Sequence, residues 1–171
     1  MVILRPTRKL SRQLPWTTRI PESSDTALGD WYVNRIVVNR QPLLILVCSR
    51  ALLPLVIFAR DVRELPSRLA GLVATRLRRL GVSAAAIQAE TLAMIPVGVS
   101  PTRDRSVLGI MVDFAKAVPY HLENVRIEDG TLQIVEDRLA ETPCHAGQSH
   151  DRVVFPETKA PELLRAKWGA G

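Results

Sequence analysis

The chain has 171 residues, 47% of them hydrophobic and 23% charged, which is enough for a proper core and ordinary for one globular domain. Its formal net charge of +6 is unevenly distributed, because residues 1–81 hold 14 Lys and Arg against 5 Asp and Glu, whereas residues 82–171 hold 9 against 12. A basic half can mark a surface for nucleic acid or another polyanion, although scattered surface charge is the commoner cause. Two cysteines exclude a disulfide framework and, with no signal peptide at the start, indicate a cytoplasmic protein.

The apolar run at 42–59 could form a membrane span, a buried helix or part of a sheet. Arg50 in its centre opposes a membrane span, and Pro54 would break a helix. Two short strands fit better, and with the strand-like segment before them they predict a three-stranded antiparallel meander over 31–58. The predicted strands are 30–40, 43–48 and 53–58.

The other segments mix short strands with helices of 3.6-residue periodicity, which predicts the α+β class with a sheet and about three to four helices. We expect a single domain over 1–171, with a core at about 2–144 and a C-terminal extension at 145–171. The predicted elements are strands at 2–5, 95–99 and near 152–155, helices at 7–14, 66–80, 84–94 and 105–123, a loop at 15–29, a turn at Asp129–Gly130, an amphipathic stretch at 131–140 and a helical turn near 160–168.

The helix at 105–123 is apolar nearly all round and carries one narrow polar stripe. The stripe consists of Ser106, Gly109, Asp113, Lys116 and Tyr120. It either faces solvent, as in any amphipathic helix, or lines a cleft.

The start of this helix is a candidate anion site. Arg103 and Arg105 flank a helix N-terminus, where unpaired N–H groups and the helix dipole favour phosphate or carboxylate, and Ser106 adds a hydroxyl. The alternative is that Asp104 or Ser106 simply caps the helix and both arginines are solvated.

The strand at 31–39 is apolar on both faces, which is typical of a central strand. Asn34 or Arg35 is then partly buried and must be hydrogen-bonded. A buried polar side chain more commonly hydrogen-bonds within the protein than to a ligand, but Asn34 and Trp31 are retained as possible ligand contacts. Asp30 could pair with an arginine.

Two further groups are weaker candidates. Arginines on the outer side of the helix at 66–80 could meet phosphates, although a solvated Arg-rich face is the usual explanation. The pairs Cys144–His145 and His150–Asp151 match no zinc signature or thiol-nucleophile arrangement, so we expect no metal site and no cofactor.

Four stretches together resemble a small bacterial domain family of unknown function, over Val2 to about Cys144. The resemblance implies an intracellular single-domain protein and supplies no activity. Relatives are closer to an "RSVLGSMND" pattern, so Ile110 and Val112 stand where Ser and Asn are usual. The four stretches are LGDWYVNRI (28–36), ALLPLVIFARD (51–61), RDRSVLGIMVDFA (103–115) and RLAETPC (138–144).

These observations favour a binding or accessory protein for an anionic ligand or nucleic acid, held by Arg103, Arg105 and Ser106 with Asn34 and Trp31 nearby. One alternative is a hydrolase for a phosphate-containing substrate, with Asp113 or Asp30 as base or metal ligand. The other is a regulatory or structural module with a protein partner. The oligomeric state is left open, and no membrane association is expected.

Overall fold

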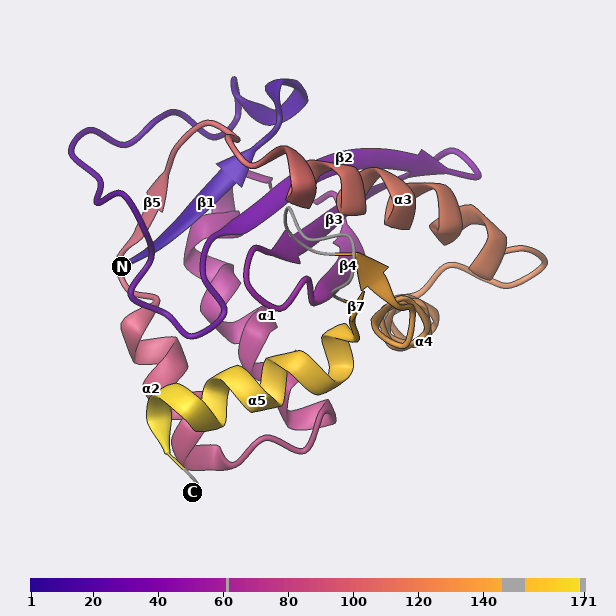
Figure 1. Cartoon of the computed structure of the whole chain (residues 1–171). Coiled ribbons are helices and arrows are strands. Elements are labelled where there is room, and N and C mark those ends of the chain that lie inside the picture. Colours follow the sequence, from indigo (N-terminus) through magenta and orange to yellow (C-terminus); the bar gives the residue numbers. More distant parts are fainter. Residues whose placement is uncertain (61, 146–152, 170–171) are drawn as a thin grey trace.

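The computed structural model describes residues 1–60, 62–145 and 153–169 and has an α+β fold with a five-stranded sheet at its centre (Figure 1). The strand order is β4-β3-β2-β1-β5. The predicted meander is confirmed, because β2, β3 and β4 pair antiparallel. The sheet as a whole is mixed, since β1 pairs parallel with both β2 and β5. The strands are β1 (Val2–Pro6), β2 (Trp31–Val38), β3 (Gln41–Cys48), β4 (Pro54–Phe58) and β5 (Val97–Val99).

The β2–β3 hairpin closes through the two residues Asn39 and Arg40, whose φ angles of 49° and 64° are both left-handed. A two-residue turn of this hand matches the natural twist of paired strands. It fixes the register in which Trp31 lies opposite Cys48, and it sends alternate side chains of β2 to opposite faces of the sheet.

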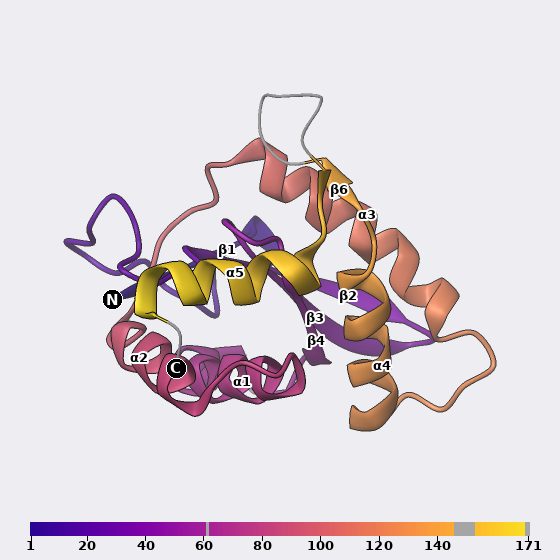
Figure 2. The same cartoon turned by 60° about the horizontal axis from the view of Figure 1, so that its bottom comes forward.

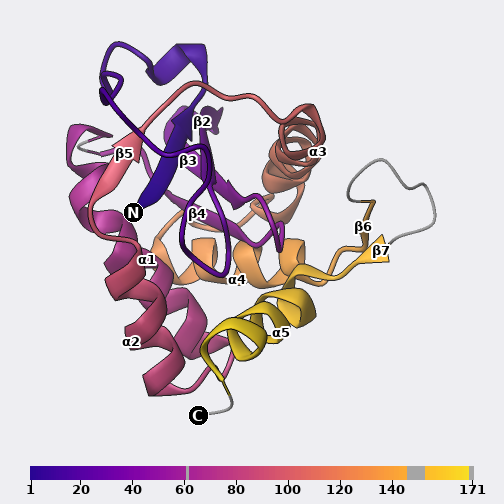
Figure 3. The same ribbon diagram turned by 60° about the vertical axis from the view of Figure 1, so that its left-hand side comes forward.

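Helices cover both faces of the sheet, as Figure 2 shows, and each face has its own hydrophobic cluster. One cluster joins the sheet to α1 and α2 and includes Ala160 and Leu164 of α5. The other joins the sheet to α3 and α4. Figure 3 shows α5 beside α2, with the short ribbon of β6 and β7 projecting beyond it. These elements are α1 (Leu65–Arg79), α2 (Ala84–Ala93), α3 (Arg105–His121), α4 (Asp129–Ala140), α5 (Pro156–Trp168), β6 (Cys144–His145) and β7 (Val153–Val154).

Three predicted elements are corrected. Asp129 and Gly130 do not form a turn but begin α4, because Glu128 and Thr131 form a capping box around the first turn. The predicted helix at 7–14 is reduced to a 3₁₀ turn, η1, at Arg8–Leu10. The final helical turn is a full helix, α5, whose buried side chains belong to the core cluster on the α1–α2 face rather than to a separate tail.

Glu90 of α2 is a buried carboxylate that joins three segments. Its Oε2 accepts hydrogen bonds from the Ala27 N–H at 2.8 Å and the Trp168 indole N–H at 2.7 Å, and its Oε1 accepts from the Leu28 N–H at 3.0 Å. Only 1% of the residue is exposed. Glu90 therefore connects the loop before β2 and the end of α5 to α2.

No helix in the described part of the chain is both long and apolar enough to cross a membrane. The apolar run at 42–59 instead forms β3 and β4, and every residue from Leu43 to Cys48 is buried.

Candidate functional site

The start of α3 is capped by its own aspartate. Asp104 Oδ1 accepts hydrogen bonds from the N–H of Ser106 at 2.9 Å, the hydroxyl of Ser106 at 2.6 Å and the N–H of Val107 at 3.4 Å. Burial raises the pKa of this carboxyl, but these bonds and the charge of Arg103 outweigh burial and hold the pKa below its usual value. The N–H groups predicted to bind an external anion therefore already bind a carboxylate.

The two arginines at this helix start remain on the surface. Arg103 donates from Nη2 to the carbonyl oxygen of Glu22 at 2.6 Å, and Arg105 is exposed. They can add positive potential to this face, but the structure does not place them around a cavity with the other predicted ligand contacts.

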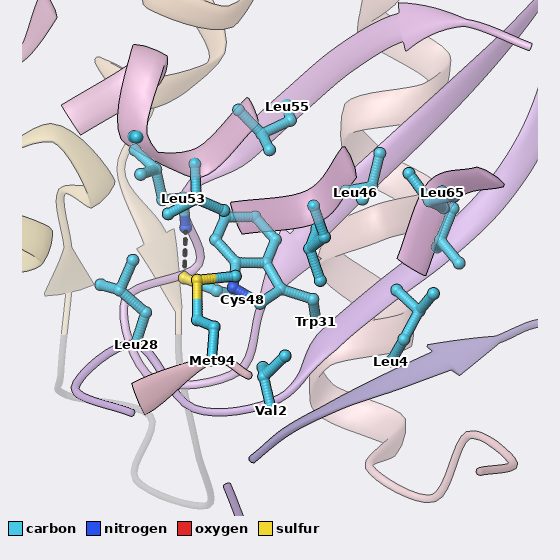
Figure 4. Packing of buried hydrophobic residues seen from close by; sticks show 14 of the residues in the cluster. Val2, Leu4, Leu28, Trp31, Leu46, Cys48, Leu53, Leu55, Leu65 and Met94 are labelled. Carbon is cyan, nitrogen blue, oxygen red and sulfur yellow. Dashed lines mark hydrogen bonds between the residues drawn. The ribbon is translucent and has the colours of Figure 1, made fainter. Parts of the chain in front are cut away.

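The predicted contacts from β2 lie elsewhere. Trp31 is fully buried in the cluster on the face opposite α3, against Cys48 and Met94 (Figure 4). Asn34 Oδ1 accepts from the Thr7 hydroxyl at 2.7 Å and from the Arg35 N–H at 2.9 Å. Trp31 therefore lies on the other side of the sheet from Arg103, Arg105 and Ser106, and the Asn34 side-chain oxygen is already occupied by two donors.

Asp30 does pair with an arginine. Its Oδ2 accepts from Arg5 Nε at 2.5 Å, and its Oδ1 accepts from the Ser24 hydroxyl at 2.6 Å. Both groups are buried, and Arg5 also donates to the carbonyl oxygen of Pro101 at 2.7 Å. Asp30 therefore fastens the loop before β2 and the segment before α3 to β1, and both of its oxygens are already bonded.

The polar stripe of α3 does reach a cavity. A pocket of about 330 Å³, which we name the α3 pocket, brings Ser106 and Asp113 together with the end of α4 and β6. Two of the stretches that suggested the family, 103–115 and 138–144, meet here. The pocket is lined by Ser106, Gly109, Ile110, Asp113, Phe114, Ala117, Leu139, Thr142, Pro143, Cys144 and His145.

The surroundings of Cys144 disfavour the thiolate form that a nucleophile requires. Burial and the charge of Asp113 raise the pKa of its thiol to about 11, so it is protonated at neutral pH. His150 and Asp151 lie outside the described residues. Among the residues that the structure describes, no three His, Cys, Asp or Glu side chains gather as a metal-binding group.

A second and larger cavity lies at the β4 edge of the sheet, between α1 and α4. Its volume is about 570 Å³, and five arginines line it together with three carboxylates, so we name it the arginine cleft. The arginines come from the end of β4, from α1 and from the segment before α4. They are Arg60, Arg68, Arg76, Arg79 and Arg126, and the carboxylates are Glu128, Asp129 and Glu136.

Two of these arginines are bound to α4. Arg76 Nη1 and Arg79 Nη2 donate to Asp137 Oδ1 at 2.6 and 2.7 Å, and Arg79 Nη1 donates to Glu136 Oε2 at 2.8 Å. Glu136 Oε1 accepts the Val56 N–H of the edge strand at 2.9 Å. Burial dominates here, since it raises the pKa of Glu136 and lowers that of Arg76.

Arg76 has hydrogen-bonding capacity left. Its side chain is only 1% exposed, and its Nε is buried without a hydrogen-bond acceptor, although the Glu136 carboxylate lies 3.9 Å away. The Arg60 guanidinium lies over the Phe58 ring, 4.9 Å from the centroid. The ion pairs within the described residues do not involve Arg60, Arg68 or Arg126.

One feature of the sequence pointed to part of this cleft. It was the set of arginines on the helix at 66–80, which supplies Arg68, Arg76 and Arg79. Arg60 and Arg126 were missed, because their approach to α1 depends on how α4 packs on the sheet edge. An acidic pair in the predicted amphipathic stretch at 131–140, Glu136–Asp137, was the available hint that some of these arginines have partners.

The fold and these cavities define an α+β protein with two candidate binding sites. The chain belongs to the family described as domain of unknown function DUF6933, whose family model matches residues 3–159 and confirms the resemblance drawn from the sequence. No curated protein and no solved structure matches the chain at a significant level.

Proposed function

We propose that this protein is a binding or accessory protein for a phosphate-bearing partner, which it holds in the arginine cleft. The observation that carries the proposal is the convergence of five arginines from three parts of the chain on one cavity. The guanidinium group suits phosphate because its planar fork can donate two parallel hydrogen bonds. The proposal keeps the anionic ligand expected from the sequence and moves its site from the start of α3 to the cleft.

The charges within the cleft support an anionic ligand. Five arginines line it against three carboxylates, and even with Asp137, which pairs with Arg76 and Arg79, positive charge remains in excess. Glu136 and Asp137 hold Arg76 and Arg79 in place, and a positioned arginine loses less side-chain entropy on binding than a free one. The buried Nε of Arg76 is a donor that an anion could satisfy.

The hydrolase alternative gains no comparable support. Asp30 is bonded to Arg5 and Ser24, and Asp113 lines the α3 pocket rather than the arginine cleft. Neither carboxylate is therefore placed beside the arginines that would bind a substrate phosphate.

The proposal is tested by fluorescence anisotropy with a labelled single-stranded oligonucleotide, and by competition with pyrophosphate, over a range of salt concentrations. Arg68 and Arg126 are both exposed, so the double change Arg68→Ala with Arg126→Ala should leave the fold intact. We expect it to weaken binding about tenfold or more and to lower the slope of log K against log salt by about 1 to 2.

The matched control is Arg103→Ala with Arg105→Ala, which removes the same charge from the start of α3. It should weaken binding much less than the cleft variant. Competition by pyrophosphate at micromolar concentration would identify a small phosphate ligand, whereas competition only by oligonucleotides would identify nucleic acid. If the wild-type protein binds none of these probes at low salt, or if the control variant loses more affinity than the cleft variant, the proposal is wrong.

A further inference from the structure

Gly109 leaves open space in the wall of the α3 pocket. A Cβ built at this position would meet no atom within 4 Å. Its backbone is helical and has no positive φ, so the conformation does not require glycine either. Glycine weakens a helix interior relative to alanine. Gly109 therefore lowers the stability of α3, and no contact among the described residues explains why a glycine stands there.

The pocket around this space combines apolar walls with the polar side chains of Ser106, Thr142 and His145 and with one carboxylate, Asp113. Ile110 and Phe114 of α3 and Leu139 of α4 form hydrophobic walls. Asp113 lies one turn beyond Gly109, and its carboxylate is close enough to the buried Cys144 thiol to raise the thiol pKa. No lysine or arginine is among the described residues that line the pocket.

We propose that the α3 pocket binds a small organic cation, an ammonium group carried on an apolar body. The ammonium pairs with Asp113, and the body fills the space above Gly109 against Ile110 and Phe114. The volume of about 330 Å³ lies at the small end of the range of about 300–1,000 Å³ that is usual for ligand pockets. This site prefers a cation, whereas the arginine cleft prefers an anion, so a test of one site does not depend on the outcome at the other.

The experiment is a titration of the full chain followed by NMR or calorimetry, with phenethylamine as the probe and phenethyl alcohol as its neutral analogue. A fragment of this size is expected to bind with a Kd of about a millimolar or weaker. Phenethylamine should bind at least about tenfold more tightly than the alcohol, because only the ammonium can form a charge-assisted bond with Asp113.

Three variants locate the site. Asp113→Asn should remove the preference for the amine while keeping weak binding of both probes. Gly109→Leu should abolish binding of both, because the side chain fills the pocket. The control is Gly71→Leu in α1, another helical glycine whose Cβ would meet no atom within 4 Å, and it should bind as the wild type does. Both leucine variants should keep or raise Tm, which excludes unfolding as the cause of lost binding.

Three results would overturn the proposal. The first is equal binding of the amine and the alcohol, and the second is retention of binding in Gly109→Leu. The third is tighter binding of N-acetyl-lysinamide than of phenethylamine, which would identify a lysine side chain of a protein partner as the occupant in place of a small amine.

Discussion

A substitution at Glu90 tests whether a buried carboxylate without a cationic partner among the described residues stabilises this fold. The perturbation is Glu90→Gln, which keeps the size of the side chain and replaces one acceptor oxygen with an NH₂ donor. Among the described residues no cation forms an ion pair with Glu90, so its three N–H donors must offset the cost of burying the charge.

The magnitude follows from these three bonds. The Gln oxygen can take the place of Oε2 and keep Ala27 and Trp168, but the new amide then faces the N–H of Leu28. One hydrogen bond to a charged group is lost, at about 1.5–3 kcal/mol, and a buried donor is left unsatisfied, at about 1–3 kcal/mol. We expect Glu90→Gln to lower the free energy of unfolding by about 4 kcal/mol and Tm by roughly 10 °C.

The assay is urea unfolding followed by circular dichroism at neutral pH. The control is Gln88→Glu, an isosteric change at an exposed position of the same helix, which should alter stability by less than about 0.5 kcal/mol. Trp168→Phe removes the indole donor and part of the ring, and its effect should be only modestly smaller in the Glu90→Gln background, because the Gln oxygen keeps this bond in a neutral form. If Glu90→Gln is neutral or stabilising, desolvation outweighs the hydrogen bonds and the reasoning is refuted.

Three other substitutions or modifications check separate features. Trp31→Phe should change the free energy of unfolding by less than about 1.5 kcal/mol in urea unfolding, because the loss of buried carbon is offset by removal of an indole N–H that has no acceptor, whereas Trp31→Ala should cost about 3–5 kcal/mol. Cys144 should react slowly with iodoacetamide at pH 8 and rapidly in urea, because the pKa of its thiol in the folded chain is about 11. Since this pKa exceeds the unfolded value of about 9, the thiol should also lower the free energy of unfolding as pH rises above 9. Fast alkylation of the native chain would contradict both statements. Asp104→Ala should cost about 1 kcal/mol at pH 7, and because the folded pKa is depressed the cost should shrink as pH falls below 3.8, so an undiminished cost at low pH would show that the cap does not depend on the carboxylate charge.

The local part of the fold was predictable from the sequence. The meander at 31–58 follows from two prolines and one arginine in an apolar run, because these residues exclude the longer elements that the run could form. A cap by Asp104 was likewise one of the two alternatives predicted for the start of α3, the other being an anion site. The Asp129–Gly130 turn was wrong because two local signals conflict there, and the capping box around Glu128 and Thr131 prevails.

The long-range part was not predictable in the same way. Nothing near Val2 in the sequence specifies that β1 lies beside β5 as well as β2, since parallel strands are joined through distant segments. Trp31 illustrates the same limit for the site. Trp31 was retained as a possible ligand contact on this strand, but the register of β2 directs it to the face opposite α3. Ser106 and Asp113 do line one pocket, as the polar stripe of a single helix allowed.

β1 precedes the other strands of the sheet in the chain, and yet its two neighbours in the sheet begin at Trp31 and Val97. The meander of β2, β3 and β4 can form from local contacts, but it exposes the edge of β2 until β1 docks, and docked β1 keeps an open outer edge until β5 is made. Unpaired strand edges readily join other chains. A nascent chain that stalls before Val97 should therefore be more prone to aggregate than the finished chain, whose open edges are reduced to β4, against which α4 packs, and the three residues of β5.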